Sequence, residues 1–300
     1  MSRTNCADPH IKNLWHPIGA IDEAGVNNVK KTVLLTEKLS YKVFPDKTVK
    51  VWYSDMSDTV PESDADLVKS QIEYGYVWAC LGDDPIPLFD VPEYREPDRR
   101  NLNAATMGVH VSAPRAVENF LDMGHFPFVH TDILGVEPHT EVKDYNVTIK
   151  ADSDEIVATQ CRFYQPMAAA TATSGQDVEY VYRVPHPYCS VLYKSSPGYD
   201  DRLDVIALFL QPIDEEHVNA HMMLSLLDDV NEDKNIRLFQ QTIFGQDKPI
   251  LENQYPKRLP LDPRAEVPIR ADKTAIAYRR WLREKGITYG VIPAEELVQS

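Results

Sequence analysis

The chain has 300 residues, of which 43% are hydrophobic and 26% charged, as expected for a globular protein with a sizeable core. Its formal net charge of −15 argues against nucleic acid or an anionic membrane as the main partner. The sequence has no signal-peptide pattern and no apolar run of about 18 residues, so we expect a cytoplasmic protein. Its cysteines are far apart in sequence, which is typical of free thiols in a reducing compartment.

The first part of the chain predicts a small β domain over residues 1–85. Short apolar runs that alternate with turn residues predict its strands. Residues 54–68 are acidic and polar, which favours a loop. Residues 83–100 combine prolines with charges and predict a linker into a larger domain, which we place at 86–300. The strands expected in the small domain cover 32–35, 39–44, 49–53 and 74–81.

A helix is expected to begin at Ser112, which is a good N-cap residue. It would run through to His125, and Pro127 would then break or kink it. Asp122 lies three residues before His125, on the same face of this helix, so its carboxylate can orient the imidazole. His130 follows five residues after His125, and the kink would bring the two imidazoles to one point.

The second domain is predicted to contain a mostly antiparallel sheet joined by hairpins. A long helix over 231–253, with Pro249 inside it, and a last helix over 273–285 follow this sheet. The order of strands and helices predicts an α+β fold. The strands expected in the sheet cover 142–150, 155–164, 178–184, 190–195, 204–211 and 217–227.

Asp247 is the most unusual residue of the long helix, because it falls on the apolar stripe that includes Ile236 and Ile243. A buried carboxylate is costly unless it is paired or bound to a cation. Two histidines and one carboxylate form the facial triad of non-haem Fe(II) oxygenases, so His125, His130 and Asp247 are candidate metal ligands. A zinc hydrolase uses the same ligand types, and histidines beside aromatic residues also occur as packed core residues. Spacing alone therefore does not select iron.

Four motifs resemble one family, the α subunits of the Rieske non-haem iron oxygenases. Asn119-Phe-Leu-Asp122-x-x-His125-x-x-x-x-His130 resembles the family's mononuclear-iron signature, and residues 246–253 resemble its segment for the third ligand. Residues 74–83 resemble the strand that leads from its Rieske domain into its catalytic domain, and residues 14–19 resemble its usual opening. The motifs occur in the family's order and span most of residues 13–285.

The resemblance implies a fold, a metal and an electron path. The catalytic domain would have a helix-grip fold of the START or Bet v 1 type, in which an antiparallel sheet packs with long helices. Fe(II) would be bound by His125, His130 and Asp247. Asp122 would connect His125 to a cluster-ligating histidine across a subunit boundary, and the family commonly forms oligomers.

One departure from the family pattern concerns the [2Fe–2S] cluster. Family members bind it through Cys-x-His and Cys-x-x-His pairs, whereas residues 45–72 contain neither cysteine nor histidine. The domain at 1–85 would therefore be a shortened Rieske-like β domain without a cluster. Electrons would come from NADH through a separate Rieske-containing reductase. An additional structural subunit is a further partner that the resemblance allows.

Residues 244–257 and 271–283 are similar to the C-terminal helices of the N-demethylases of the bacterial caffeine pathway. That group includes a component that lacks the Rieske domain and demethylates 7-methylxanthine. The resemblance implies O₂-dependent N-demethylation of a methylxanthine to xanthine and formaldehyde. Two alternatives stay open: an O-demethylase or ring hydroxylase of another small aromatic compound, and a non-catalytic ligand-binding or scaffold subunit.

Substrate contacts are expected near the triad. Gln240 and Gln241 lie about two helical turns before Asp247, where an amide could hydrogen bond to a purine. Asn119 lies beside Asp122 in the iron signature. Periodicity suggests an apolar pocket wall, formed by Phe163, Met167, Phe209, Leu238 and Ile243. The remaining histidines considered, which are expected to be structural, are His16, His186, His217 and His221.

Overall fold

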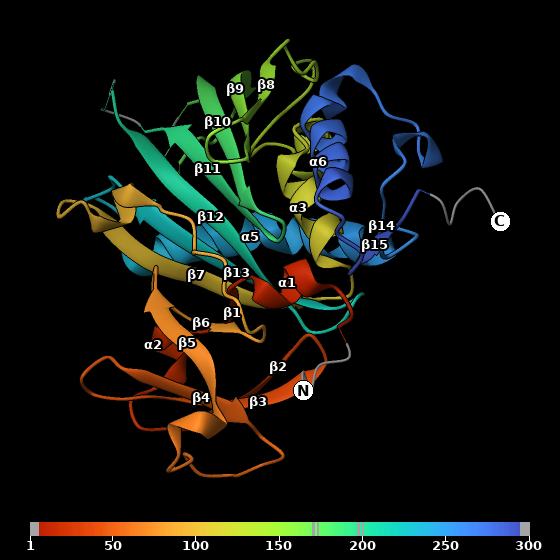
Figure 1. Cartoon of the computed structure of the whole chain (residues 1–300). Helices are drawn as coiled ribbons and strands as arrows, with labels where there is room; N and C mark the ends of the chain where they lie inside the picture. The colour runs from red at the N-terminus through yellow and green to blue at the C-terminus, as the bar shows by residue number, and fades with distance from the viewer. Residues whose placement is uncertain (1–5, 170–171, 173, 197–198, 200, 295–300) are drawn as a thin grey trace.

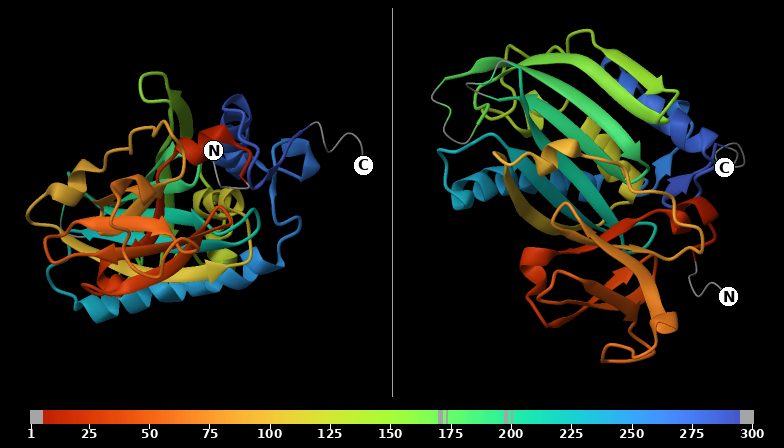
Figure 2. Two further views of the ribbon diagram at one scale, coloured as in Figure 1. Left: turned by 60° about the horizontal axis from the view of Figure 1, so that its bottom comes forward. Right: turned by 60° about the vertical axis from the view of Figure 1, so that its left-hand side comes forward.

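The structure, a computed structural model, describes residues 6–169, 172, 174–196, 199 and 201–294. It consists of a small antiparallel sheet near the N-terminus and a larger antiparallel sheet that packs with the long helices (Figure 1). Figure 2 shows the same arrangement from two further sides, with the small sheet forming a lobe at the edge of the molecule. No helix among the described residues is both long and apolar enough to cross a lipid bilayer.

The small sheet has the strand order β1-β6-β5-β4-β3-β2. All four expected strands are present, as β2, β3, β4 and β6. Two further strands were not expected: β1, because Pro17 and Gly19 interrupt its apolar pattern, and β5, because it follows directly on an acidic loop. The bounds are β1 His16–Ala20, β2 Val29–Leu34, β3 Glu37–Val43, β4 Val49–Tyr53, β5 Leu67–Glu73 and β6 Tyr76–Cys80, with short helices α1 Pro9–Asn13 and α2 Ile21–Ala24.

The large sheet has the order β7-β13-β12-β11-β10-β9-β8, with every neighbouring pair antiparallel. All six expected strands are present. The edge strand β7 was not expected, because its residues alternate only weakly between apolar and polar. The bounds are β7 Arg100–Val109, β8 Asn146–Lys150, β9 Glu155–Gln165, β10 Gln176–His186, β11 Cys189–Ser195, β12 Leu203–Pro212 and β13 Val218–Leu226.

The helices pack on one face of the large sheet, in agreement with the predicted combination of an antiparallel sheet and long helices. Helix α5 contacts β7, α3 contacts β11 and β12, and α6 contacts β8 and β9. A short parallel pair joins the segment after α5 to the C-terminal part of the chain. The bounds are α3 Ala113–Leu121, α4 Phe126–Val129, α5 Asp233–Asn253, α6 Lys273–Glu284, β14 Leu259–Pro260 and β15 Val291–Ile292.

The two faces of the large sheet have different neighbours because side chains alternate along each strand. On β12, Phe209 belongs to an aromatic cluster with Tyr76 and Trp78 of the small sheet, with ring centroids 5.7 and 5.1 Å away. Ile206, on the opposite face, lines a cavity beneath the helices. The middle of the large sheet therefore forms a wall between the N-terminal sheet and that cavity.

Candidate metal centre and adjoining cavity

Asp122 ends helix α3 and begins the turn that carries both candidate histidines. Its backbone is extended (φ −81°, ψ 117°), and its Oδ1 accepts a hydrogen bond from the backbone N–H of Gly124 at 2.7 Å. The expected continuous helix with a kink at Pro127 is therefore wrong. Pro127 instead lies in the first turn of the short helix α4, where its missing N–H is tolerated. His125 precedes α4 and His130 follows it, so one helical turn brings the two rings together.

The structure brings His125, His130 and Asp247 together. The two Nε2 atoms are 3.1 Å apart, and Asp247 Oδ1 lies 3.3 Å from His125 Nε2 and 3.1 Å from His130 Nε2. These three residues form the single group of potential metal ligands found among the described residues. Asp247 is only 8% exposed, as expected from its place on the apolar stripe of α5.

This triangle of atoms fits a divalent metal. Ligands at about 2.1 Å from an ion are about 3.0 Å apart at adjacent corners of an octahedron and about 3.4 Å apart in a tetrahedron. Asp247 Oδ1 is buried and forms no hydrogen bond of acceptable geometry with any described group, which is unfavourable unless a cation is bound. The donor set of two imidazoles and a carboxylate suits Fe(II) or Zn²⁺.

Each candidate histidine is oriented by a side-chain acceptor at its other nitrogen. Asp122 Oδ2 lies 3.1 Å from His125 Nδ1, and Gln246 Oε1 lies 2.9 Å from His130 Nδ1. Because carboxylate and amide oxygens accept hydrogen bonds, both rings carry their proton on Nδ1. In the neutral form of each ring, Nε2 then carries a lone pair on the side of Asp247 that can bind a metal.

The charges around the triad also favour a cation. Burial lowers the pKa of His125, but the hydrogen bond to Asp122 and the contact with Asp247 outweigh burial and raise it to about 9. Burial raises the pKa of Asp247, but the neighbouring imidazoles outweigh this effect and hold it below its usual value. The site is thus built to retain positive charge, either as a proton or as a metal ion.

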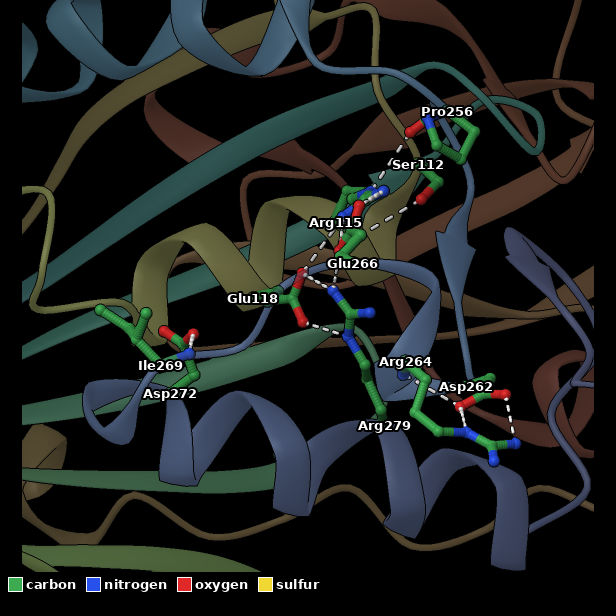
Figure 3. A network of polar contacts seen from close by, with 10 residues as sticks. All are labelled: Ser112, Arg115, Glu118, Pro256, Asp262, Arg264, Glu266, Ile269, Asp272 and Arg279. Carbon is green, nitrogen blue, oxygen red and sulfur yellow. Dashed lines mark hydrogen bonds and ion pairs between the residues drawn. The ribbon is translucent and has the colours of Figure 1, made fainter.

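A network of ion pairs fixes α3 beside the site (Figure 3). Arg279 of α6 donates to both carboxylate oxygens of Glu118, at 2.5 and 2.8 Å. Arg115, which is fully buried, donates to Glu118 at 3.3 Å and to Glu266 at 2.5 and 3.0 Å. Glu118 and Arg279 are nearly buried as well, with 12% and 8% of their side chains exposed. The network ties the helix that ends at Asp122 to α6 and to the segment after α5.

Asp122 and His125 also border a groove on the outside of the molecule. This outer groove has a volume of about 520 Å³ and is lined by residues of α3, α5 and α6 and of the segment before α6. The Asp122 side chain is 34% exposed there, whereas the His130 side chain is 1% exposed. Three exposed apolar side chains also line the groove: Ile250, Val267 and Ile276.

The triad faces an inner cavity on its other side. This cavity is narrow, about 70 Å³, and lies between α3, α5 and the large sheet. It is below the roughly 300–1,000 Å³ of typical ligand pockets, so a ligand of purine size must move lining side chains such as Phe239. The lining residues are mostly apolar and aromatic, including Phe120, Phe126, Leu134, Tyr180, Tyr182, Leu192, Ile206, Met222, Phe239 and Phe244.

Three of the expected substrate contacts line the inner cavity, namely Asn119, Gln240 and Ile243. Phe163 lies behind this lining and packs edge-to-face on Phe126 and Tyr180. Met167 is not among the lining residues, because it lies on the loop after β9, where its backbone N–H bonds to Ile133.

Three other expectations are wrong. Phe209 points to the opposite face of the sheet, because β12 alternates and Ile206 already faces the cavity. Leu238 is 59% exposed on the outer side of α5. Gln241 points away from the cavity toward β7, where its amide donates to the Ala104 carbonyl at 2.8 Å. A helix shifts its face by about 100° per residue, so neighbouring glutamines cannot both face one cavity.

Sequence reasoning missed two residues at the site. Gln246 is next to the candidate ligand Asp247, and a polar residue beside a buried acid is a signal that could have drawn attention to it. Lys194 lines the inner cavity from β11 and is only 6% exposed. Lys194 follows apolar Leu192 by two residues in the strand Cys189–Ser195, so both side chains lie on one face, and this spacing is a signal that could have shown an inward-facing lysine.

Comparison with known proteins decides the family. The family model described as the vanillate O-demethylase oxygenase C-terminal domain matches residues 109–286, more than half of the chain. The chain belongs to this family of Rieske-type non-haem iron oxygenases. The oxygenase is 46% identical to the probable methylxanthine N7-demethylase NdmC of Pseudomonas sp. (strain TJI-51), over 92% of this chain and 95% of that relative. It is 26% identical to the methylxanthine N1-demethylase NdmA of Pseudomonas putida, over 70% of this chain and 58% of that relative.

Solved structures show the same fold. NdmA of Pseudomonas putida CBB5 with caffeine matches the oxygenase with a TM-score of 0.70 and 20% identity, covering 92% of this chain and 91% of that one. Dicamba monooxygenase bound to dicamba matches with a TM-score of 0.68 and 16% identity, covering 92% of this chain and 98% of that one. The architecture is therefore that of oxygenases in this family.

The oxygenase has no Cys-x-His or Cys-x-x-His pair in its sequence. Its four cysteines are all buried and form no disulfide, and burial raises the pKa of Cys6 to about 11 and of Cys161 to about 12. His16 is fully buried, with Nε2 2.8 Å from the Ile11 carbonyl oxygen. The residues that the structure describes thus offer no ligand set for a Rieske cluster.

Proposed function

We propose that this oxygenase component removes the N-methyl group of a methylxanthine, converting 7-methylxanthine to xanthine and formaldehyde. The observation that carries the proposal is the 46% identity to a probable methylxanthine N7-demethylase, which extends over 92% of the chain. The fold alone would not choose a substrate, because oxygenases that share it act on different compounds. The polar residues Asn119 and Gln240 in an otherwise apolar cavity are compatible with a flat heteroaromatic ligand.

In this proposal Fe(II) is held by His125, His130 and Asp247. Asp122 orients His125, and Gln246 orients His130. When bound, ferrous iron supplies the activation of dioxygen that these side chains cannot perform. The residues of the inner cavity hold the methyl group next to the ligands and exclude water. His130, which is only 1% exposed, lies at the inner side of the triad, where the cavity begins.

The overall reaction balances with two electrons from outside the chain. One oxygen atom is inserted into an N-methyl C–H bond, and the other is reduced to water with two electrons and two protons. The N-hydroxymethyl product then breaks its C–N bond, giving formaldehyde and a ring N–H. The sequence offers no Cys-x-His or Cys-x-x-His pair that could bind a Rieske cluster, so a separate Rieske-containing reductase that oxidises NADH would supply the electrons.

We propose Asp122 as the residue through which these electrons arrive. It contacts His125 on one side and is 34% exposed to the outer groove on the other. A histidine of the reductase's cluster would approach Asp122 through this groove. Residues 1–85 would then be a cluster-less Rieske-like domain, and residues 86–300 would form the catalytic domain.

A second candidate is oxidative O-demethylation of an aromatic acid. Lys194 favours it, because a buried ammonium in the inner cavity could pair with a substrate carboxylate.

Reconstitution separates the candidates. The protein is loaded with Fe(II), supplied with a Rieske-containing reductase and NADH, and assayed for formaldehyde with methylxanthines and with methoxybenzoates. We expect formaldehyde from 7-methylxanthine, and none from a His130→Ala variant. Absence of iron binding would reject both candidates. Iron binding with product from methoxybenzoates alone would reject the first and support the second.

A further inference from the structure

Lys194 is a buried cation in the inner cavity. On β11, Leu192 and Lys194 face the cavity, whereas Val191 packs in the aromatic cluster on the other face of the sheet. Lys194 Nζ donates a hydrogen bond to the Ala168 carbonyl and lies 5.9 Å from the centroid of the Tyr180 ring. No carboxylate in the described part of the chain forms an ion pair with it.

Among the described residues, the ammonium of Lys194 lacks a full set of hydrogen-bond acceptors. An ammonium has three N–H donors, and the described residues accept one hydrogen bond from it. Asp204, its partner across the β11–β12 pair, accepts a hydrogen bond from the backbone of Leu227 at 2.8 Å instead of forming an ion pair. Burial lowers the pKa of Lys194 to about 8, so the side chain is still mostly protonated at neutral pH. Within the described part of the chain, Lys194 thus lines a cavity as a buried cation without an ion-pair partner, which indicates an anionic or strongly accepting ligand.

We propose that Lys194 is the specificity-determining residue of the cavity, and that its ammonium binds a negatively charged oxygen at the edge of a purine-2,6-dione that keeps an ionisable ring N–H. The inference rests on the proposed function for the choice of a purine. A xanthine with a free ring N–H is a weak acid, and its anion carries charge on the adjacent carbonyl oxygen. A fully methylated xanthine cannot ionise in this way.

The same contact would set which methyl group reacts. The triad and Lys194 line one cavity, so fixing one edge of the ring at Lys194 decides which part of the ring faces Asp247. Asn119 and Gln240, which also line the cavity, offer amide donors and acceptors for the other ring atoms. Because lysine can only donate, a fully methylated xanthine would offer it only neutral carbonyl oxygens, and the contact would lose its second charge.

Ligand binding without turnover tests the proposal. Dissociation constants are measured by calorimetry, with no reductase present, for 7-methylxanthine, caffeine and 3-methoxybenzoate. The proteins are the wild type, Lys194→Met, Lys194→Arg and the control Lys234→Met, whose lysine is exposed at the start of α5. We expect the wild type and Lys234→Met to bind 7-methylxanthine at least about tenfold more tightly than caffeine, a ratio expected of one charge-assisted contact. Lys194→Met should lose this preference, and Lys194→Arg should keep part of it.

The outcomes separate this inference from the proposed function. A wild type that binds caffeine as tightly as 7-methylxanthine would overturn the inference without any variant. An unchanged preference in Lys194→Met would overturn it as well. Binding of 3-methoxybenzoate alone, lost in Lys194→Met, would reject the N-demethylase proposal while retaining Lys194 as the anion-binding residue.

Discussion

Gln246 and His130 are joined by a hydrogen bond of 2.9 Å between the amide oxygen and Nδ1. Gln246 therefore keeps the proton of His130 on Nδ1 and leaves Nε2 free to face Asp247. The residue that fixes one candidate ligand is thus the chain neighbour of another, and helix α5 positions both. Asp122 performs the same function for His125 from the end of α3.

Removing this acceptor should weaken metal binding. We expect Gln246→Leu to lower Fe(II) affinity by about 10–100-fold, because the ring would no longer be held in the right tautomer and orientation. Gln246→Glu keeps an acceptor oxygen and should retain most of the affinity. Competitive titration with a metal-binding dye under anaerobic conditions measures both. Equal affinity in Gln246→Leu and the wild type would contradict this role.

Asp122 should matter for electron delivery more than for metal retention. Asp122→Ala should also bind Fe(II) more weakly, because His125 loses its acceptor, but we expect it to lose turnover with the reductase even when saturated with Fe(II). The carboxylate that joins His125 to the outer groove is then gone. Asp122→Asn, which keeps an acceptor for His125, should bind Fe(II) as the wild type does and still lose turnover. Asp229→Ala, at an exposed position, is the control. Full turnover in Asp122→Ala would rule out the bridging role.

The buried ion network should contribute strongly to stability. Glu118→Ala would leave Arg115 and Arg279 with Glu266 as their shared carboxylate, and removing one member of a buried ion pair costs about 3–5 kcal/mol. Urea unfolding measures the loss. Glu141→Ala should change stability little. It breaks an ion pair with Arg270 in which the Glu141 side chain is 80% exposed and the Arg270 side chain 70% exposed. Comparable losses in the two variants would show that burial is not the deciding factor.

Stability should fall in mild acid because of buried neutral histidines. Burial lowers the pKa of His16 to about 4 and of His221 to about 3, and it lowers the pKa of His186 well below its usual value. The unfolded chain binds a proton at each of these residues near pH 6.5, and the folded chain does not. Their contribution is therefore fully present above about pH 6.5 and decreases as the pH falls toward 4.

His221 allows this expectation to be measured. Its two ring nitrogens lie 3.1 Å from Thr106 Oγ1 and 3.2 Å from Gln211 Oε1, so glutamine is a reasonable replacement. Urea unfolding of the metal-free protein between pH 7 and 5 should show an average slope smaller by about 1 kcal/mol per pH unit in His221→Gln than in the wild type. Because the result is a difference, the other titrating groups cancel. Parallel slopes would mean that His221 does not control acid stability.

Local patterns predicted the parts of the site that depend on nearby residues. Sequence patterns predicted that Asp122 lies close to His125 and that Asp247 lies on an apolar stripe. Each of these features depends on a single turn or helix. The end of helix α3 at Asp122 was not predicted. There the Asp122 side chain accepts a hydrogen bond from the Gly124 backbone, so the helix ends before it reaches Pro127. Turn chemistry of this kind competes with helix propensity and is hard to see in a sequence.

Residues on strands were harder to assign than residues on helices. Alternation showed that Phe209 faces one side of the sheet, but not whether that side holds the cavity or the N-terminal sheet. Lys194 was missed for the opposite reason, since a charged residue in a strand normally indicates the solvent side. Both assignments depend on which layer covers which face, and that is decided by tertiary packing.

The wall formed by the large sheet has a consequence for any attempt to trim this protein. Phe209 and Trp78 are both fully buried, at the contact between the two sheets. A shortened chain beginning near residue 86 would expose Phe209 on one face of β12. The other face of the same strand lines the cavity through Ile206. The N-terminal sheet would therefore be needed for solubility and cavity shape, although it stores no electrons.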